Sequence, residues 1–185
     1  DAALPLDFKT FLSVSDHLKE DYGIDVILNS QNLEDGVYVV TRNANGSITT
    51  DALNGLSPLA DHVTSINLWK REIEEGVMES LVEFPQLLEL NLSESNIRNE
   101  NLASLKKLRK LKSLNLFGTA IGDDSIGTLS GIRSLKILRL RNTQITETGV
   151  ARLESTLPRC EVLAFIAPVT VVEEEASDES PATSN

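Results

Sequence analysis

The 185-residue sequence predicts an α/β solenoid: a right-handed superhelix of strand-helix units with a curved parallel sheet on its concave side and a small α/β cap at its N-terminus. Two observations predict this fold. Apolar residues recur every 24 residues in seven columns, and within each unit their spacing changes from two to three. A fixed period of about 20 to 50 residues is typical of solenoids, because one unit cannot bury its apolar faces alone.

Each unit is predicted to contain a strand, a turn and a short helix. Leu114 and Leu116 alternate with polar residues, which is the period of a strand with one buried face. Ile126, Leu129 and Ile132 are spaced three apart, as on the buried stripe of a helix. Strands pack more closely than helices, so stacked units are expected to curve with their strands inside. Side chains suited to a helix start recur at Glu75, Asn99, Asp123 and Glu147.

Residues from Val63 to about Leu157 resemble four successive leucine-rich repeats, with the pattern L-x-x-L-x-L-x-x-N/C-x-L. The segment N-T-Q-I-T-E-T-G at residues 142–149 resembles the T-x-I-T-D-x-G subtype of bacterial, planctomycete-type repeat proteins. The resemblance implies a non-enzymatic binding module. It also implies a buried ladder to the loop backbone, made by hydroxyls in three units and distorted at Arg71 in the first. The ladder position is occupied by Arg71, Ser95, Thr119 and Thr143.

The chain is predicted to divide into four parts: a helix-strand cap at 1–36, a degenerate first repeat at 37–62, 24-residue repeats at 63–166 with a closing strand within 164–172, and an acidic disordered tail at 167–185. The cap helix is expected to end near Gly23, before a strand at 24–28. A faint similarity to the β-α-β modules of secretin-type bacterial envelope proteins leaves a separate N-terminal module open. The helical stripe is predicted at Phe8, Phe11, Leu12, Ser15, Leu18 and Tyr22.

The formal charge of -11 is uneven: residues 1–62 carry -7, residues 167–185 carry -5, and the repeats carry +1. An acidic molecule repels nucleic acid and anionic lipid, so neither is expected as a partner. No apolar run reaches the roughly 20 residues of a membrane span. The first residue is not Met, from which we expect a processed N-terminus compatible with a secreted or cell-envelope protein, although a cytoplasmic one stays open. We expect a monomer.

No catalytic, metal or cofactor site is expected. His17 and His62 have no second His or Cys at ligand spacing, and the single cysteine, Cys160, fits a buried apolar position. Helix starts explain the paired carboxylates at 74–75 and 123–124. Phosphate-binding and nucleophile-elbow motifs do not occur in the sequence.

The predicted function is binding of another protein or peptide on the concave strand face. Side chains alternate along a strand, so the residues between the buried ones point to this face. Trp69 and Phe117 would flank the small Ser93 and leave a notch between two rings. Aromatic and Arg side chains dominate binding energy in interfaces, although the rings could instead simply cover the sheet. The predicted contacts are Asn67, Trp69, Glu89, Asn91, Ser93, Asn115, Phe117, Arg139 and Arg141.

A basic stripe across the third and fourth units is the second predicted feature. It consists of Arg109, Lys112, Arg133 and Lys136. A solvated helix face explains it equally well. The functional alternatives are a site for an acidic protein surface and a dock for the acidic residues between 173 and 179, either of which salt would weaken. Two other roles stay open for the whole protein: a structural or envelope-assembly component, and a substrate-recognition accessory subunit of a larger enzyme complex.

Overall fold

The computed structural model describes residues 7–30, 35–41 and 46–164. Its main sheet comprises, in spatial order, β1 (Ile24–Leu28), β2 (Val37–Thr41), β4 (Val63–Asn67), β6 (Glu89–Asn91), β7 (Ser113–Asn115), β8 (Ile137–Arg139) and β9 (Glu161–Leu163). The β1–β2 pair is antiparallel, and every other neighbouring pair is parallel. A second, two-stranded parallel sheet pairs β3 (Ser47–Ile48) with β5 (Glu72–Ile73).

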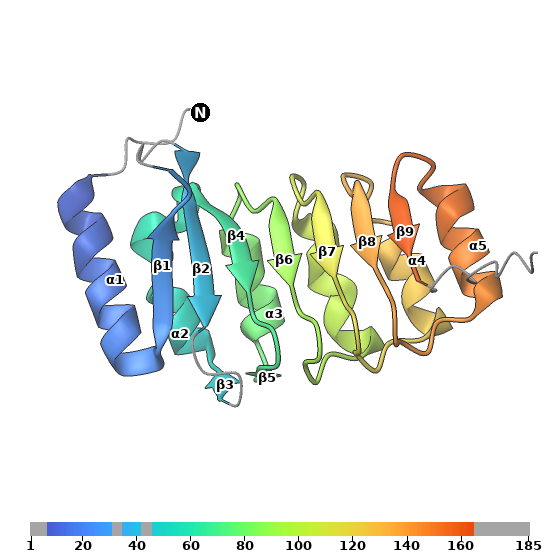
Figure 1. Cartoon of the computed structure of the whole chain (residues 1–185), viewed down its shortest axis with the longest axis horizontal. Coiled ribbons are helices and arrows are strands. Elements are labelled where there is room, and N and C mark those ends of the chain that lie inside the picture. The colour runs from blue at the N-terminus through green and yellow to red at the C-terminus, as the bar shows by residue number, and fades with distance from the viewer. Residues whose placement is uncertain (1–6, 31–34, 42–45, 165–185) are drawn as a thin grey trace, which may run out of the picture.

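Helical segments connect the strands and are α1 (Phe8–Tyr22), α2 (Thr50–Asn54), α3 (Val77–Ser80), α4 (Ile126–Leu129) and α5 (Glu147–Thr156), with the 3₁₀ helices η2 (Ser57–His62), η3 (Leu81–Glu83), η4 (Asn99–Lys107) and η5 (Asp123–Ser125). In Figure 1, α2, α3 and α4 lie behind the sheet, while α1 and α5 lie at its two ends. The opposite face of the sheet is therefore not covered by any helix that the structure describes.

The 24-residue period of the sequence sets the register of the sheet. From β4 to β8, directly paired residues lie 24 positions apart, as Ser65 and Glu89 do. The apolar residue at the middle of each of these strands points to the helices. Leu90, Leu114 and Leu138 are only 2%, 0% and 0% exposed. The parallel sheet that the period predicts is present, and its core lies between the strands and the helices.

Each strand is followed by a turn that needs a left-handed backbone. The residues involved, Lys70, Glu94, Gly118 and Asn142, are again 24 apart and have φ angles of 56°, 55°, 67° and 58°. At the next position, three hydroxyls donate to the carbonyl three residues earlier, and these bonds measure 2.6, 2.7 and 2.7 Å. These hydroxyls bond to the loop backbone, as the family resemblance implies. They belong to Ser95, Thr119 and Thr143.

Arg71 replaces the hydroxyl in the first unit, and the structure is different there. The side chain is buried, and its Nη2 donates to the carbonyl of Ser47 at 3.2 Å, in the small β3–β5 sheet. Burial lowers the pKa of the guanidinium below its usual value. In place of the hydroxyl bond, the first unit thus has a buried cation that ties β3 to the turn after β4.

The N-terminal helix ends near Gly23, as its sequence predicts, and it begins after Asp7. The Asp7 carboxylate accepts from the backbone N–H of residues 9 and 10, and Gly23 ends the helix with φ of 63°. The predicted buried stripe was wrong in part, because Phe8 and Leu12 are 56% and 44% exposed. The buried residues are Phe11, Val14 and Leu18, and these form the face of α1 that packs against the core.

The structure describes only part of the predicted C-terminal region. The last described strand is β9, which pairs with β8 and ends at Leu163, before the buried Ala164. Residues 165–172 and the predicted acidic tail at 167–185 lie outside the described residues. The predicted boundaries between cap, degenerate repeat and regular repeats stay predictions.

Candidate binding face

The side of the sheet away from the helices, called the strand face below, carries two rows of side chains. Pairing register defines both rows across all seven strands of the main sheet. All of these residues are exposed or half-buried, whereas the residue between the two rows is buried on every strand except β9, where Val162 is half-buried. The first row is Ile27, Tyr38, Ser65, Glu89, Ser113, Ile137 and Glu161. The second row is Asp25, Val40, Asn67, Asn91, Asn115, Arg139 and Leu163.

Sequence reasoning placed the repeats on this face but missed the contribution of β1 and β2. Tyr38 pairs with Ser65, and Ile27 pairs with Tyr38, so the N-terminal strands extend the same surface. The 24-residue period could not show this, because β1 runs antiparallel and has no counterpart in the repeats. The alternation of apolar and polar residues at Ile24, Asp25 and Val26 was the available signal.

The asparagines of the second row hold the turns that follow their strands. The Oδ1 atoms of Asn67, Asn91 and Asn115 each accept the backbone N–H two residues later, at 3.1, 3.0 and 3.1 Å. These three predicted contact residues therefore have a structural role as well. The bond also fixes which end of each amide faces outward, since Oδ1 must be the acceptor.

A hollow of about 190 Å³ lies over the middle of the strand face. Five of the nine predicted contacts line it, whereas Trp69, Ser93, Phe117 and Arg141 do not. The hollow is therefore displaced from the predicted notch toward β2. Its lining is Tyr38, Ser65, Asn67, Glu89, Leu90, Asn91, Ser113, Asn115 and Arg139.

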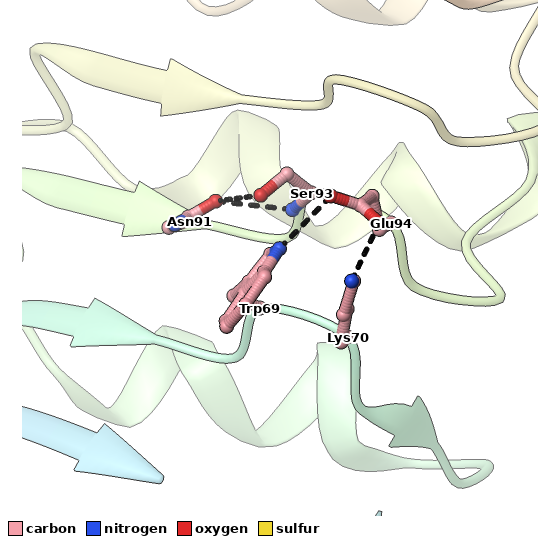
Figure 2. Close-up of polar contacts among 5 residues, drawn as sticks. All are labelled: Trp69, Lys70, Asn91, Ser93 and Glu94. Carbon is pink, nitrogen blue, oxygen red and sulfur yellow. Dashed lines mark hydrogen bonds and ion pairs between the residues drawn. The ribbon is translucent and has the colours of Figure 1, made fainter. Parts of the chain in front are cut away.

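Trp69 belongs to the turn row, which also contains Ser93, Phe117 and Arg141, and Figure 2 shows how its indole is held. Indole Nε1 donates to Glu94 Oε1 at 3.1 Å, and Lys70 Nζ lies 3.3 Å from Glu94 Oε2 and 4.8 Å from the ring centroid. The hydrogen bond from Trp69 is the main cause that lowers the pKa of the Glu94 carboxyl, and Lys70 lowers it further. Sequence reasoning missed this fixing of the ring, because it depends on the left-handed turns that place residues 70 and 94 side by side.

The two aromatic rings are exposed, and the residue between them is not. Trp69 is 43% exposed and Phe117 is 38% exposed, whereas Ser93 is only 4% exposed. The Ser93 hydroxyl donates to Asn91 Oδ1 at 2.7 Å (Figure 2). Ser93 thus leaves space between the rings and offers little surface for a partner to contact.

The basic stripe follows the loops that lead from helix to strand in the third and fourth units. Arg109, Lys112, Arg133 and Lys136 are all exposed. Lys112 and Lys136 immediately precede β7 and β8, and the backbone N–H of Lys136 donates to the carbonyl of Lys112 at 2.8 Å. Lys112 and Lys136 therefore lie at the edge of the strand face where β7 and β8 begin.

Asp123, which we assigned to the dipole of its own helix, acts mainly on the next unit. Its carboxylate accepts from the backbone N–H of Thr146 at 2.9 Å and from the Thr146 hydroxyl at 2.7 Å, and these bonds lower its pKa. Asn99 makes the equivalent contact one unit earlier, accepting from the N–H of Gly122 at 2.8 Å. Asn99 and Asp123 therefore clamp neighbouring units together.

The remaining chemistry-bearing residues of the described chain have local contacts. His17 lies 2.9 Å from Asp21 on the exposed face of α1, and burial raises the pKa of the half-buried Cys160 thiol. Within the described residues, no group of three or more His, Cys, Asp or Glu side chains is placed to hold a metal ion. Nor does that part of the chain contain a helix long and apolar enough to span a membrane.

Comparison with known proteins identifies one repeat directly. The leucine-rich-repeat family model matches residues 107–130, which contain the third unit's strand. No curated protein matches the sequence.

Solved structures of several leucine-rich-repeat proteins are similar to this chain. An internalin from Listeria monocytogenes is 24% identical over 60% of this chain and 31% of its own, with a TM-score of 0.48. A Leptospira interrogans leucine-rich-repeat protein is 18% identical over 63% of this chain and 34% of its own, with a TM-score of 0.43. The ectodomain of the Arabidopsis thaliana receptor kinase SOBIR1 is 14% identical over 88% of this chain and 94% of its own, with a TM-score of 0.49.

The chain spans about a third of the length of the two bacterial proteins. Its own strand register, turn positions and the match at residues 107–130 agree on one description. The chain carries a leucine-rich repeat, and its mostly parallel sheet with helices on one side fits the α/β fold of leucine-rich-repeat proteins.

Proposed function

We propose that this protein is a non-catalytic interaction module that binds a partner protein or peptide on the strand face. Leucine-rich-repeat proteins generally mediate protein–protein interactions, and solenoids use the extended surface of their stacked units for this. The observation that carries the proposal is the uncovered strand face, which displays two large exposed aromatic side chains, Trp69 and Phe117, beside a polar hollow.

The fixed position of Trp69 supports this function. A side chain that is already held by Glu94 and Lys70 loses less conformational freedom when a partner binds. Aromatic residues that combine a fixed position with exposed apolar area are typical binding hot spots. We further propose that the protein binds as a monomer and that its repeats are of the bacterial T-x-I-T-D-x-G subtype.

The test compares three immobilised proteins: the wild type, the Trp69→Ala/Phe117→Ala double variant and a matched Phe8→Ala/Leu12→Ala variant on the outer face of α1. Proteins captured by the wild type from extracts are identified by mass spectrometry, purified, and titrated against all three. We expect the strand-face variant to weaken binding at least about tenfold, the effect of losing hot-spot side chains. The α1 variant should bind like the wild type.

Thermal unfolding of the same proteins separates binding from folding. Because both rings are substantially exposed, we expect the melting temperature of the strand-face variant to stay close to that of the wild type. A large loss of stability would show that the rings are part of the core. Equal weakening by the α1 variant, or unchanged binding by the strand-face variant, would contradict the proposed function.

A further inference from the structure

The second row of the strand face offers hydrogen-bond donors without matching acceptors. Asn91 and Asn115 lie on neighbouring strands, and each Oδ1 is already bonded to a turn N–H. Their Nδ2 groups, which carry two donor hydrogens each, must therefore face away from those turns. No acceptor among the described residues bonds to either Nδ2, and both side chains line the hollow.

Arg139 extends this row of donors onto the next strand. It pairs directly with Asn115 across β7 and β8, and its Nη1 donates to Ser113 Oγ at 3.3 Å, so the guanidinium leans over the hollow. No carboxylate of the described residues lies within ion-pair distance of it. Neighbouring strands lie about 4.8 Å apart, so the three donors span about 10 Å.

The charge around β7 and β8 is mostly positive. Residues 105–141 contain nine basic and two acidic residues, and the two acidic ones, Asp123 and Asp124, lie at a helix start on the other side of the unit. Lys112 and Lys136 stand before the strands, and Arg141 follows β8. The acidic residues of the first row, Glu89 and Glu161, flank this region on neighbouring strands.

We propose that Asn91, Asn115 and Arg139 form a site for a carboxylate side chain on an acidic, extended segment of the partner protein. The inference rests on the proposed function and names the chemistry of the partner. A guanidinium donates strong, charge-assisted hydrogen bonds to a carboxylate, and the two amide groups offer further donors to the same oxygens. The surrounding cations attract an acidic segment over longer distances. Glu89, at the other wall of the hollow, orients the segment so that its acidic residue lies toward β8.

The test uses two blocked peptides of the same length, one alternating glutamate with serine and the other alternating glutamine with serine. Each is titrated into ¹⁵N-labelled full-length protein while the side-chain amide signals of asparagine are recorded. We expect the glutamate peptide to shift the Nδ2–H signals of Asn91 and Asn115. The glutamine peptide should leave them unchanged, because an amide carbonyl attracts the guanidinium far less.

Two variants separate a specific site from general attraction. Arg139→Gln and Lys107→Gln remove the same charge, but Lys107 is an exposed residue at the end of η4, away from the strand face. We expect Arg139→Gln to weaken the glutamate peptide about tenfold, as for loss of a charge-assisted bond, and Lys107→Gln to weaken it less than about twofold. Equal weakening by both variants, or equal shifts with both peptides, would overturn the proposal.

Two further outcomes are informative. Neutralising the chain's own Glu173, Glu174 and Glu175 to glutamine should leave the Asn91 and Asn115 signals unchanged without peptide. If it shifts them, the occupant is this chain's own acidic segment, and assignment to a separate partner is overturned. If no peptide binds while the purified partner still depends on Trp69 and Phe117, the carboxylate site fails and the proposed function stands.

Discussion

Gly118→Ala and Gly127→Ala add the same methyl group to the third unit, and we expect them to change the free energy of unfolding in opposite directions. Gly118 lies in the turn after β7 with φ of 67°, where an added Cβ would meet Glu94 Cγ at 3.1 Å. A left-handed backbone costs an alanine about 1–2 kcal/mol. The smaller entropy of the unfolded chain returns about 0.4–1 kcal/mol of this, so we expect a net loss of about 1 kcal/mol.

Gly127 has the opposite surroundings. It lies in α4 and is exposed, and no heavy atom stands within 4 Å of an added Cβ. Alanine is favoured over glycine inside a helix by about 0.8–1 kcal/mol, and because α4 is short we expect a gain of about 0.5–1 kcal/mol. The two variants should therefore differ by about 2 kcal/mol.

Urea unfolding followed by circular dichroism measures this difference directly. For a chain of this size 1 kcal/mol corresponds to roughly 2–4 °C, so the melting temperatures of the two variants should differ by roughly 4–8 °C. Asn142→Gly is the control, because it places glycine at the equivalent turn of the next unit, where φ is 58°. We expect that variant to be at least as stable as the wild type. A Gly118→Ala protein as stable as the wild type would refute the left-handed turn.

Three further predictions concern other parts of the molecule. Thr146→Ala removes the hydroxyl that accepts from Gly149 N at 3.1 Å at the start of α5, and should cost about 1 kcal/mol in urea unfolding, whereas an unchanged midpoint would contradict the cap. The pKa of Asp123 is lowered in the folded state, so its contribution should be complete above the unfolded pKa of about 3.9 and lost as the pH falls through the folded value. The stability difference between wild type and Asp123→Asn should therefore shrink from pH 5 toward pH 2, and a constant difference would count against the clamp. Burial raises the pKa of Cys160, so iodoacetamide should alkylate it more slowly in folded than in urea-unfolded protein at pH 8, and equal rates would argue against this burial.

Local periodicity made the repeat region predictable from sequence. The strand positions, their register and the inward leucine columns all follow from a spacing of 24 residues, because every unit repeats the same short-range pattern. The hydroxyls of Ser95, Thr119 and Thr143 were also assigned to the loop backbone correctly, since their position in the repeat is fixed relative to the strand.

Contacts between units were harder to predict. That Asp123 would reach Thr146, or that Glu94 would accept from Trp69, depends on turn angles and side-chain directions that a column of residue types does not specify. The asparagines of the second row were predicted only as contacts, although the same residue type at Asn67, Asn91 and Asn115 was a signal of a repeated structural bond. The extension of the strand face onto β1 and β2 lies outside the period altogether.

Binding on the strand face is the central claim, and the affinity of the purified partner for Trp69→Ala/Phe117→Ala protein tests it most directly. The measurement is a titration by calorimetry against the wild type, this variant and the Phe8→Ala/Leu12→Ala control at one salt concentration. We predict a loss of at least about tenfold for the strand-face variant alone, with its melting temperature retained. Wild-type affinity in a folded strand-face variant would contradict the claim.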